Sequence, residues 1–537
     1  MSAEPGHYLY PGNSLAVSIG VVLVGMVVSV LLIGYRSPFW ARAASDIVSA
    51  YEGLLYNDRL PQEFLAYPAL LSGQLLGLWY RLMHLLGMLP LDRVSELPKA
   101  PTVGQFDAIW QSLIAGARGY TLFIGALYVV VFTVLVNRLT AAWQIAGLAA
   151  VALAFSSGVA LEYRIIRSEL LSSALIFTAL LATLVATRER SDNARLAWLA
   201  CAGLCAALGY VEKVQALLPA LAIPVIALAF PPHAHGGRLA TREQPGASKG
   251  DDWRKAAIVA ALALVVLIPA LRLMQWGITA MPTAAYLAYP RLGAGLSGVY
   301  QWLIGLGVVG AIVAYGWLWR IPPAQTAAVV GAVLGGLALG LCVAYLRYNP
   351  QVVAAIANPL EHLQAHAGGD GAGLPSGSGL GTVGKLVGSV FSALAIHTFL
   401  FYPSHRPTLI IEWLAIAAAV VLWRRGDRLR CVQIAVLLAA GFALDGIFTL
   451  RQYKVFYLPF TDPFIIISGA IAAVPFLDRL VQRNVQYLTM VLITLYILWG
   501  HAQSVRFAYG GSDKEGKICV VVAQFTTRVA WPYCKLQ

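Results

Sequence analysis

Long apolar stretches separated by short polar segments make up most of this chain. Each stretch runs for about 17–22 residues with almost no charge, the length that a helix needs to cross a hydrocarbon core of about 30 Å. A further apolar segment, residues 386–402, is either a short span or a helix lying at the membrane interface. We predict about thirteen membrane-spanning helices, over residues 15–34, 119–136, 142–160, 169–186, 196–211, 214–230, 256–279, 301–319, 325–345, 408–423, 431–449, 463–477 and 486–500.

Composition supports the same class of protein. Of the 537 residues, 59% are hydrophobic and only 12% are charged, against roughly 25% charged residues in a soluble domain. The net charge of +13 would suggest nucleic acid as the partner of a soluble protein. In a membrane protein, Lys and Arg gather in cytoplasmic loops and face anionic lipid headgroups. We therefore predict an all-α polytopic membrane protein that contacts membrane lipids and binds no nucleic acid.

The distribution of Lys and Arg among the loops sets the expected orientation. Placing the N-terminus in the cytoplasm puts the short basic loops inside, as the positive-inside rule requires. We interpret the first apolar segment as a retained span, because it follows no basic n-region and has no clear cleavage site. A transmembrane domain over residues 1–500 then includes a first extracytoplasmic loop (35–118) and a flexible Gly-rich extracytoplasmic loop (346–385), and a short extracytoplasmic tail follows (501–537). If 386–402 also crosses the membrane, the orientation of the second half inverts.

Carboxylates concentrate where the chain leaves the first apolar stretch. The segment "SPFWARAASDIVSAYEGLLYNDRLPQEFL" contains Asp46, Glu52, Asp58 and Glu63. Helical periodicity separates Asp46 from an apolar face, which predicts an amphipathic helix on the membrane surface. A second interfacial helix with aromatic residues follows it. A carboxylate at this rim is suited to act as a general base when partial desolvation raises its pKa; the alternative is a solvated acidic residue on an interfacial helix.

Several ordered motifs resemble one family of membrane enzymes. The features are an aspartate just after the first span, a juxtamembrane helix, a downstream Tyr-Pro, and three later segments: "EYRIIRSELLSSALIFTALLATLVAT", "AALGYVEKVQALLPAL" and "LRQYKVFYLPFTDPFIIISGAIA". Together they resemble the GT-C superfamily of membrane glycosyltransferases, in particular the protein O-mannosyltransferases and the bacterial aminoarabinose transferase. The resemblance covers most of residues 15–480. Those relatives often carry an Asp-Glu pair where Asp46 is followed here by Ile47.

The resemblance implies both a fold and a reaction. The fold would be a GT-C-like helical bundle with interfacial helices in its first extracytoplasmic loop. The reaction would move a sugar, with inversion, from a polyprenyl-phosphate-linked donor to an acceptor hydroxyl on a lipid, glycan or protein. The active site would face the periplasm of a bacterial inner membrane. Asp46 would be the general base, with Glu52 and Asp58 as the next candidates.

Cations near the extracytoplasmic ends of the spans could stabilise the leaving phosphate. Arg is well suited to phosphate because its planar guanidinium donates two parallel hydrogen bonds. The alternative is that these side chains reach lipid headgroups. The candidates for binding the donor phosphate are Lys213, Arg164, Arg167, Arg451 and Lys454.

The cysteines and histidines offer one possible disulfide and two pairs with metal-like spacing. Cys519 and Cys534 lie in the predicted extracytoplasmic tail, where an oxidising compartment permits a disulfide. Two other pairs are four positions apart, a spacing that can bind a metal when both residues lie on one helix face: Cys201 with Cys205, and His362 with His366. The sequence places no third ligand near either pair, so we assign no metal site. No cofactor is certain, and dependence on a divalent metal stays open.

Two functions without covalent chemistry compete with the transferase. A lipid or lipid-linked-sugar transporter would place charged groups mid-span and break helices at the bilayer centre. The charged groups here gather at extracytoplasmic ends and in the long first loop, which favours chemistry at the membrane surface. An assembly scaffold would assign no role to Asp46.

Overall fold

The computed structural model describes residues 11–63, 69–99, 101–232, 294–345, 397, 406–449, 455–477, 483–508, 519, 526–529, 531–532 and 534. Helices are the only regular elements in these ranges, and no strand occurs in them. The predicted span 256–279, the Gly-rich loop 346–385 and all of 386–402 except His397 lie outside the described residues.

The helices match the predicted apolar stretches closely. Seven helices in the described part of the chain are long and apolar enough to cross a membrane, and four shorter apolar segments accompany them. This confirms the predicted class of all-α polytopic membrane protein. The bundle helices are α1 (Pro11–Leu32), α4 (Val103–Thr140), α5 (Trp143–Ala154), α6 (Ser157–Glu162), α7 (Ser168–Ala186), α8 (Asp192–Glu212), α9 (Leu217–Ala227), α12 (Ala294–Leu318), α13 (Pro323–Tyr345), α17 (Leu409–Arg424), α18 (Arg428–Thr449), α19 (Asp462–Leu477) and α20 (Arg483–Ala508).

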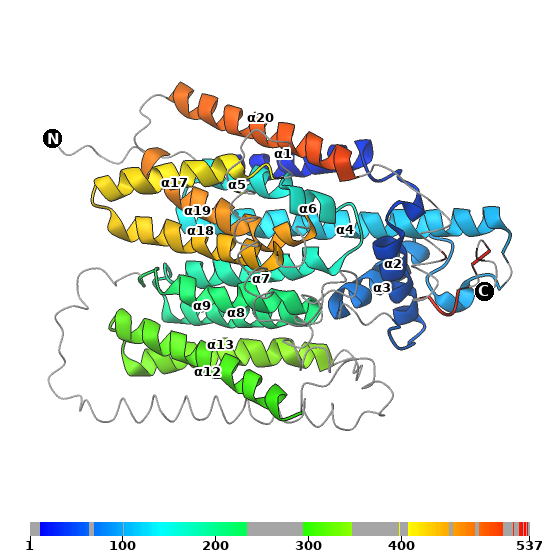
Figure 1. Ribbon diagram of the computed structural model, residues 1–537, viewed down its shortest axis with the longest axis horizontal. Helices are drawn as coiled ribbons and strands as arrows, with labels where there is room; N and C mark the ends of the chain where they lie inside the picture. Colours follow the sequence, from blue (N-terminus) through cyan, green and yellow to red (C-terminus); the bar gives the residue numbers. More distant parts are fainter. Residues whose placement is uncertain are drawn as a thin grey trace, which may run out of the picture.

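The long helices pack side by side (Figure 1). Contacts run in sequence from α12 to α13, α8, α7, α4, α5 and α1, while α17, α18 and α19 form a group that packs on α4 and α5. At one end of the bundle lie α2 (Ala43–Asn57), α3 (Leu70–Leu85) and the N-terminal part of α4 (Figure 1). We call this end the first-loop layer, because the predicted first extracytoplasmic loop supplies it.

Two helix boundaries differ from the prediction for local reasons. The predicted span 119–136 is the C-terminal part of α4, which begins at Val103 behind a capping box made by Thr102 and Gln105. At 38 residues, α4 is roughly 57 Å long and exceeds the hydrocarbon core. The predicted span 142–160 is broken between α5 and α6, where the Ser156 hydroxyl accepts from the backbone N–H of Val159 and starts a new helix.

The predicted surface helix is buried more deeply than an amphipathic pattern indicates. Its apolar face, including Ile47, Tyr51 and Leu54, is fully buried, and so are Asp46 and Ala50 on the other face. Contacts with α3 and with α4 explain this, because each neighbour covers part of α2. Neighbouring helices therefore cover the Asp46 side of α2 as well as its apolar face.

Helices α8 and α13 approach so closely that glycine is required at their crossing. A Cβ atom at Gly336 would overlap the carbonyl oxygen of Ala200, whereas a Cβ at Gly335 would meet nothing within 4 Å. Small residues allow this kind of backbone contact between membrane helices. We expect Gly336→Ala to lower the thermal unfolding midpoint, at a cost of about 1–3 kcal/mol from overpacking, and the matched control Gly335→Ala to leave it unchanged. Equal midpoints for the two variants would contradict this crossing.

Candidate functional site

Asp46 lies in the first turn of α2, with its carboxylate fully buried. Its Oδ2 accepts from Arg118 Nη2 at 2.9 Å and Nε at 3.3 Å, and its Oδ1 accepts from the backbone N–H of Ile166 at 3.0 Å. Burial raises the pKa of Asp46 above its ordinary value, although the positive charge of Arg118 opposes the shift. Asp46 thus joins α2 to α4 and to the loop that precedes α7.

Arg118 is a residue that the sequence reasoning missed. Its guanidinium is 1% exposed, and besides Asp46 it donates to the carbonyl oxygens of Ser37 at 2.6 Å and Gly34 at 3.2 Å. It therefore fixes the turn that follows α1 as well as α2. The available signal was an arginine at the edge of the apolar run 113–136, since an arginine beside a membrane span needs a partner.

A second group of charges lies where α6 ends, α7 begins and α8 ends. Glu169 Oε1 is 2.5 Å from Arg167 Nη2 and 3.0 Å from Lys213 Nζ, and Glu162 Oε1 is 3.9 Å from Arg167 Nε. We call these four residues the Glu169 cluster. Two of the predicted phosphate-binding cations, Arg167 and Lys213, are thereby brought together around one carboxylate.

Glu162 is the unusual member of this cluster. Its side chain is fully buried, and neither carboxylate oxygen has a hydrogen-bond partner. Burial, together with the negative charge of Glu169, raises the pKa of Glu162 well above its ordinary value. Burial also lowers the pKa of Lys213, against the opposing charge of Glu169. A carboxylate with free lone pairs beside two cations has the groups needed for proton transfer and for anion stabilisation.

The first-loop layer is tied directly to this cluster. Glu212, next to Lys213, accepts from the backbone N–H groups of Leu71 at 2.9 Å and Ser72 at 3.0 Å, and so caps the start of α3. The Ser49 hydroxyl of α2 donates to the carbonyl of Ile166 at 3.1 Å. Helix α3 is therefore anchored to the end of α8, and α2 is anchored to the loop that precedes α7.

The remaining predicted site residues are placed elsewhere. Glu52 accepts from the backbone N–H of Glu63 at 3.1 Å, and Asp58, at the end of α2, accepts from Ser95. Asp58 follows Asp46 by twelve positions, roughly 18 Å along a helix, so the structure does not bring the two together. Arg164 donates to Ile33, Ala160 and Ser29 rather than to the Glu169 cluster. Arg451 and Lys454 lie outside the described residues.

A further buried polar network joins α17, α18 and α19 and was also missed. Arg406 donates to Asp445 at 2.5 Å and to Asp462 at 2.8 Å. His397 contacts Glu412 at 2.8 Å and Asp445 at 3.1 Å. Charged residues inside predicted spans were the available signal. Because each charge meets a partner of opposite sign, the network stabilises the crossing of these three helices.

The tail cysteines form a disulfide, and no metal cluster is found among the residues described. Cys519 and Cys534 are bonded, with their Cα atoms 5.3 Å apart. Within the described ranges no group of three or more His, Cys, Asp or Glu residues is arranged to hold a metal ion. The free cysteines Cys201 and Cys205 lie on the bundle helix α8.

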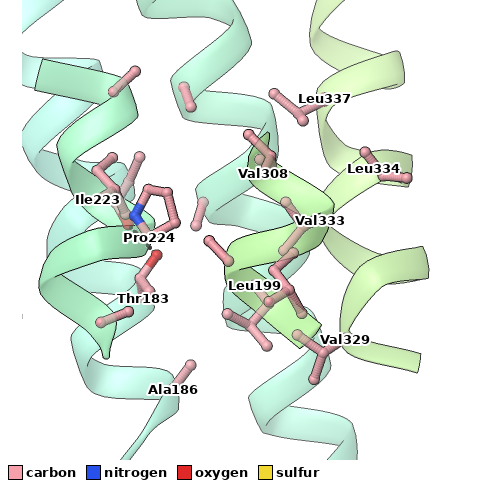
Figure 2. Close-up of a pocket in the computed structure, with 18 of the residues that line it drawn as sticks. Thr183, Ala186, Leu199, Ile223, Pro224, Val308, Val329, Val333, Leu334 and Leu337 are labelled. Atoms are coloured by element: carbon pink, nitrogen blue, oxygen red, sulfur yellow. Dashed lines mark hydrogen bonds between the residues drawn. The ribbon is translucent and has the colours of Figure 1, made fainter. Parts of the chain in front are cut away.

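An apolar cavity of about 280 Å³ lies between α7, α8 and α9 on one side and α12 and α13 on the other. Figure 2 shows Ile223 and Pro224 on one wall, facing Val308 and Val333 on the other. The lining follows α8 from Arg195 to Tyr210, roughly 22 Å along the helix. Tyr210 lies three positions before Lys213, so this end of the cavity is close in sequence to the Glu169 cluster.

The solved structures that match this chain include the following two. The oligosaccharyltransferase of Archaeoglobus fulgidus, solved with a tethered acceptor peptide, matches with a TM-score of 0.50 and 12% identity over 95% of this chain and 57% of that one. ArnT from Cupriavidus metallidurans, bound to undecaprenyl phosphate, matches with a TM-score of 0.27 and 14% identity over 86% of this chain and 78% of that one.

The likeness to the oligosaccharyltransferase concerns the fold alone. No protein-family model matches the chain, and neither does any curated protein sequence. The chain also spans little more than half the length of the oligosaccharyltransferase. The comparison therefore supports the GT-C fold that the sequence resemblance implied.

Proposed function

We propose that this chain, which has a GT-C fold, is an integral membrane glycosyltransferase. It moves a sugar from a polyprenyl-phosphate-linked donor to an acceptor hydroxyl, on a lipid, glycan or protein, at the extracytoplasmic side of the membrane. The observation that carries the proposal is the Glu169 cluster, in which two cations lie beside a buried carboxylate that has no hydrogen-bond partner.

The proposed step is an inverting displacement. The acceptor oxygen attacks the anomeric carbon as a carboxylate takes its proton, and the bond from that carbon to the phosphate oxygen breaks with its electron pair. Arg167 and Lys213 stabilise the leaving polyprenyl phosphate by charge and hydrogen bonding. The phosphate would compete with Glu169 for both cations, since each of them already contacts that carboxylate.

Two buried carboxylates are candidates for the proton acceptor. Asp46 is the base proposed from the sequence, and to act it must exchange its contacts with Arg118 and Ile166 for the acceptor hydroxyl. Glu162 has both oxygens without a hydrogen-bond partner and is the second candidate. Burial raises the pKa of each above its ordinary value, which makes each carboxylate a stronger proton acceptor than one in water.

The cavity supports a donor with a hydrocarbon chain. Its lining is almost wholly apolar and follows the helices toward Lys213, so one chain of a prenyl lipid could lie along it with its phosphate at the cluster. The disulfide of Cys519 and Cys534 supports an oxidising compartment for the tail, such as the periplasm beside a bacterial inner membrane.

A transfer assay tests this function. Membranes holding the protein would receive a panel of polyprenyl-phosphate sugars with a radiolabel in the sugar, and we expect label to pass into a covalent product. Glu162→Gln should lower the initial rate by about 10²-fold or more if Glu162 is the base, while the control Glu189→Gln, at the far end of α7, should not. Movement of labelled donor across the membrane with no covalent product would instead favour a transporter.

A further inference from the structure

The C-terminal segment packs on the first-loop layer although more than 400 positions separate them. The ring of Trp531 stacks on Trp110 with centroids 5.5 Å apart and meets Phe106 edge-on at 5.0 Å. Its indole N–H donates to the Thr526 hydroxyl at 2.8 Å. Because Trp110 is fully buried and Trp531 is 9% exposed, this contact belongs to the core of the layer and is not a loose surface association.

Glu63 joins this segment to α2. Its Oε2 accepts from the Tyr51 hydroxyl at 2.9 Å and from the Thr527 N–H at 3.1 Å and hydroxyl at 2.8 Å, and its Oε1 accepts from Arg528 Nε at 2.9 Å. The Glu63 side chain is 15% exposed. Tyr51 lies on α2, five positions after Asp46, so one carboxylate holds α2 and the C-terminal segment together.

The disulfide closes the part of the segment that makes these contacts. Thr527, Arg528 and Trp531 all lie between Cys519 and Cys534, which are 15 positions apart. In the loop-entropy model, closing a loop restricts the conformations of the chain before it binds. The closed loop can therefore bind Glu63 and Trp110 with a smaller entropic cost than an open chain.

We propose that Glu63 is a positioning residue for sugar transfer, through which the disulfide-closed C-terminal segment holds α2 and its Asp46 in place. This inference rests on the proposed function. Opening the disulfide then lowers transfer even though no cysteine touches the reacting groups. A dithiol reductant supplies two electrons and two protons to the S–S bond and is itself oxidised to a disulfide. Transfer is thus confined to protein that has reached an oxidising compartment.

The Glu63 contact should be insensitive to pH in the physiological range. Burial alone would raise the pKa of Glu63, but hydrogen bonds from Thr527, Arg528 and Tyr51 outweigh it and lower the pKa. A carboxyl with a lowered folded pKa contributes stability that is complete above about pH 4.5 and is lost only as the pH falls through the lower value. Between pH 5 and 8, α2 should therefore stay held in oxidised protein.

The test compares oxidised and dithiothreitol-treated protein in lipid nanodiscs. We expect reduction to speed amide hydrogen exchange in α2 (43–57) but not in α7, and to lower kcat for sugar transfer about tenfold, because small displacements of reacting groups carry large rate penalties. KM for the donor should change little. Glu63→Gln should reproduce both effects without reductant. Cys342→Ser, at an exposed cysteine, and Glu189→Gln are the matched controls.

The outcomes separate this inference from the proposed function. Unchanged exchange in α2 after reduction would overturn the inference whether or not the protein is a transferase. Faster amide exchange in α2 with an unchanged kcat per folded molecule would also overturn the inference. The Glu63 contact would then stabilise the fold without affecting sugar transfer. If oxidised wild-type protein transfers no sugar from any donor, the proposed function fails and the positioning role fails with it, while the exchange data still decide whether the segment holds α2.

Discussion

Asp46→Asn is expected to lower sugar transfer by about 10²–10⁴-fold, the range that positioned proton transfer supplies. The substitution keeps the shape of the side chain and removes its charge. It also leaves the Arg118 guanidinium, which is 1% exposed, without its counter-charge. Breaking a buried ion pair in this way costs about 3–5 kcal/mol, so a loss of stability should accompany the loss of rate.

The double variant Asp46→Asn/Arg118→Gln separates these two effects. It replaces the buried ion pair by two amides, so part of the lost stability should return, as a double-mutant cycle of thermal unfolding would show. If Asp46 is the base, the initial rate of transfer stays low in the double variant. If the rate recovers with the stability, Asp46 acts as the partner of Arg118 and Glu162 becomes the base.

Lys213→Met is expected to lower transfer by about 10²–10³-fold, the effect of removing one donor that stabilises developing negative charge. Stability should change less than in Asp46→Asn, because Glu169 keeps Arg167 at 2.5 Å as a partner. The initial rate of sugar transfer from a saturating donor measures the effect. Arg430→Met is the matched control, since Arg430 pairs with Asp427 at the start of α18 and lies outside both the Glu169 cluster and the cavity lining. A Lys213→Met enzyme with the wild-type rate would remove Lys213 from the leaving-group site.

The sequence was sufficient for features that depend on local composition. Runs of apolar residues predicted the bundle helices to within a few residues for α7, α8, α13 and α19. The agreement has a physical reason. A helix in a bilayer must form all its backbone hydrogen bonds internally and present apolar side chains to lipid, so a span is visible as a run of consecutive apolar residues. The GT-C fold was also predicted, from the order of motifs that follow those helices.

Local signals found some of the candidate site as well. Arg167 and Lys213 stand beside span ends, where a charged residue is noticeable, and the structure places both around Glu169. Periodicity predicted α2 and its buried apolar face, but it could not show that α4 and the loop before α7 cover the Asp46 side as well.

Only the tertiary structure decided which charges are partners. Asp46 meets Arg118 from 72 positions away, and Glu63 meets Arg528 from 465 positions away. A buried charge needs an opposite charge or hydrogen bonds. The sequence shows that such a partner is needed but does not show which residue it is. Which helices cross, and at which positions along their axes, decides which charged side chains meet. That arrangement depends on packing across the whole bundle and not on the residues nearby in the chain.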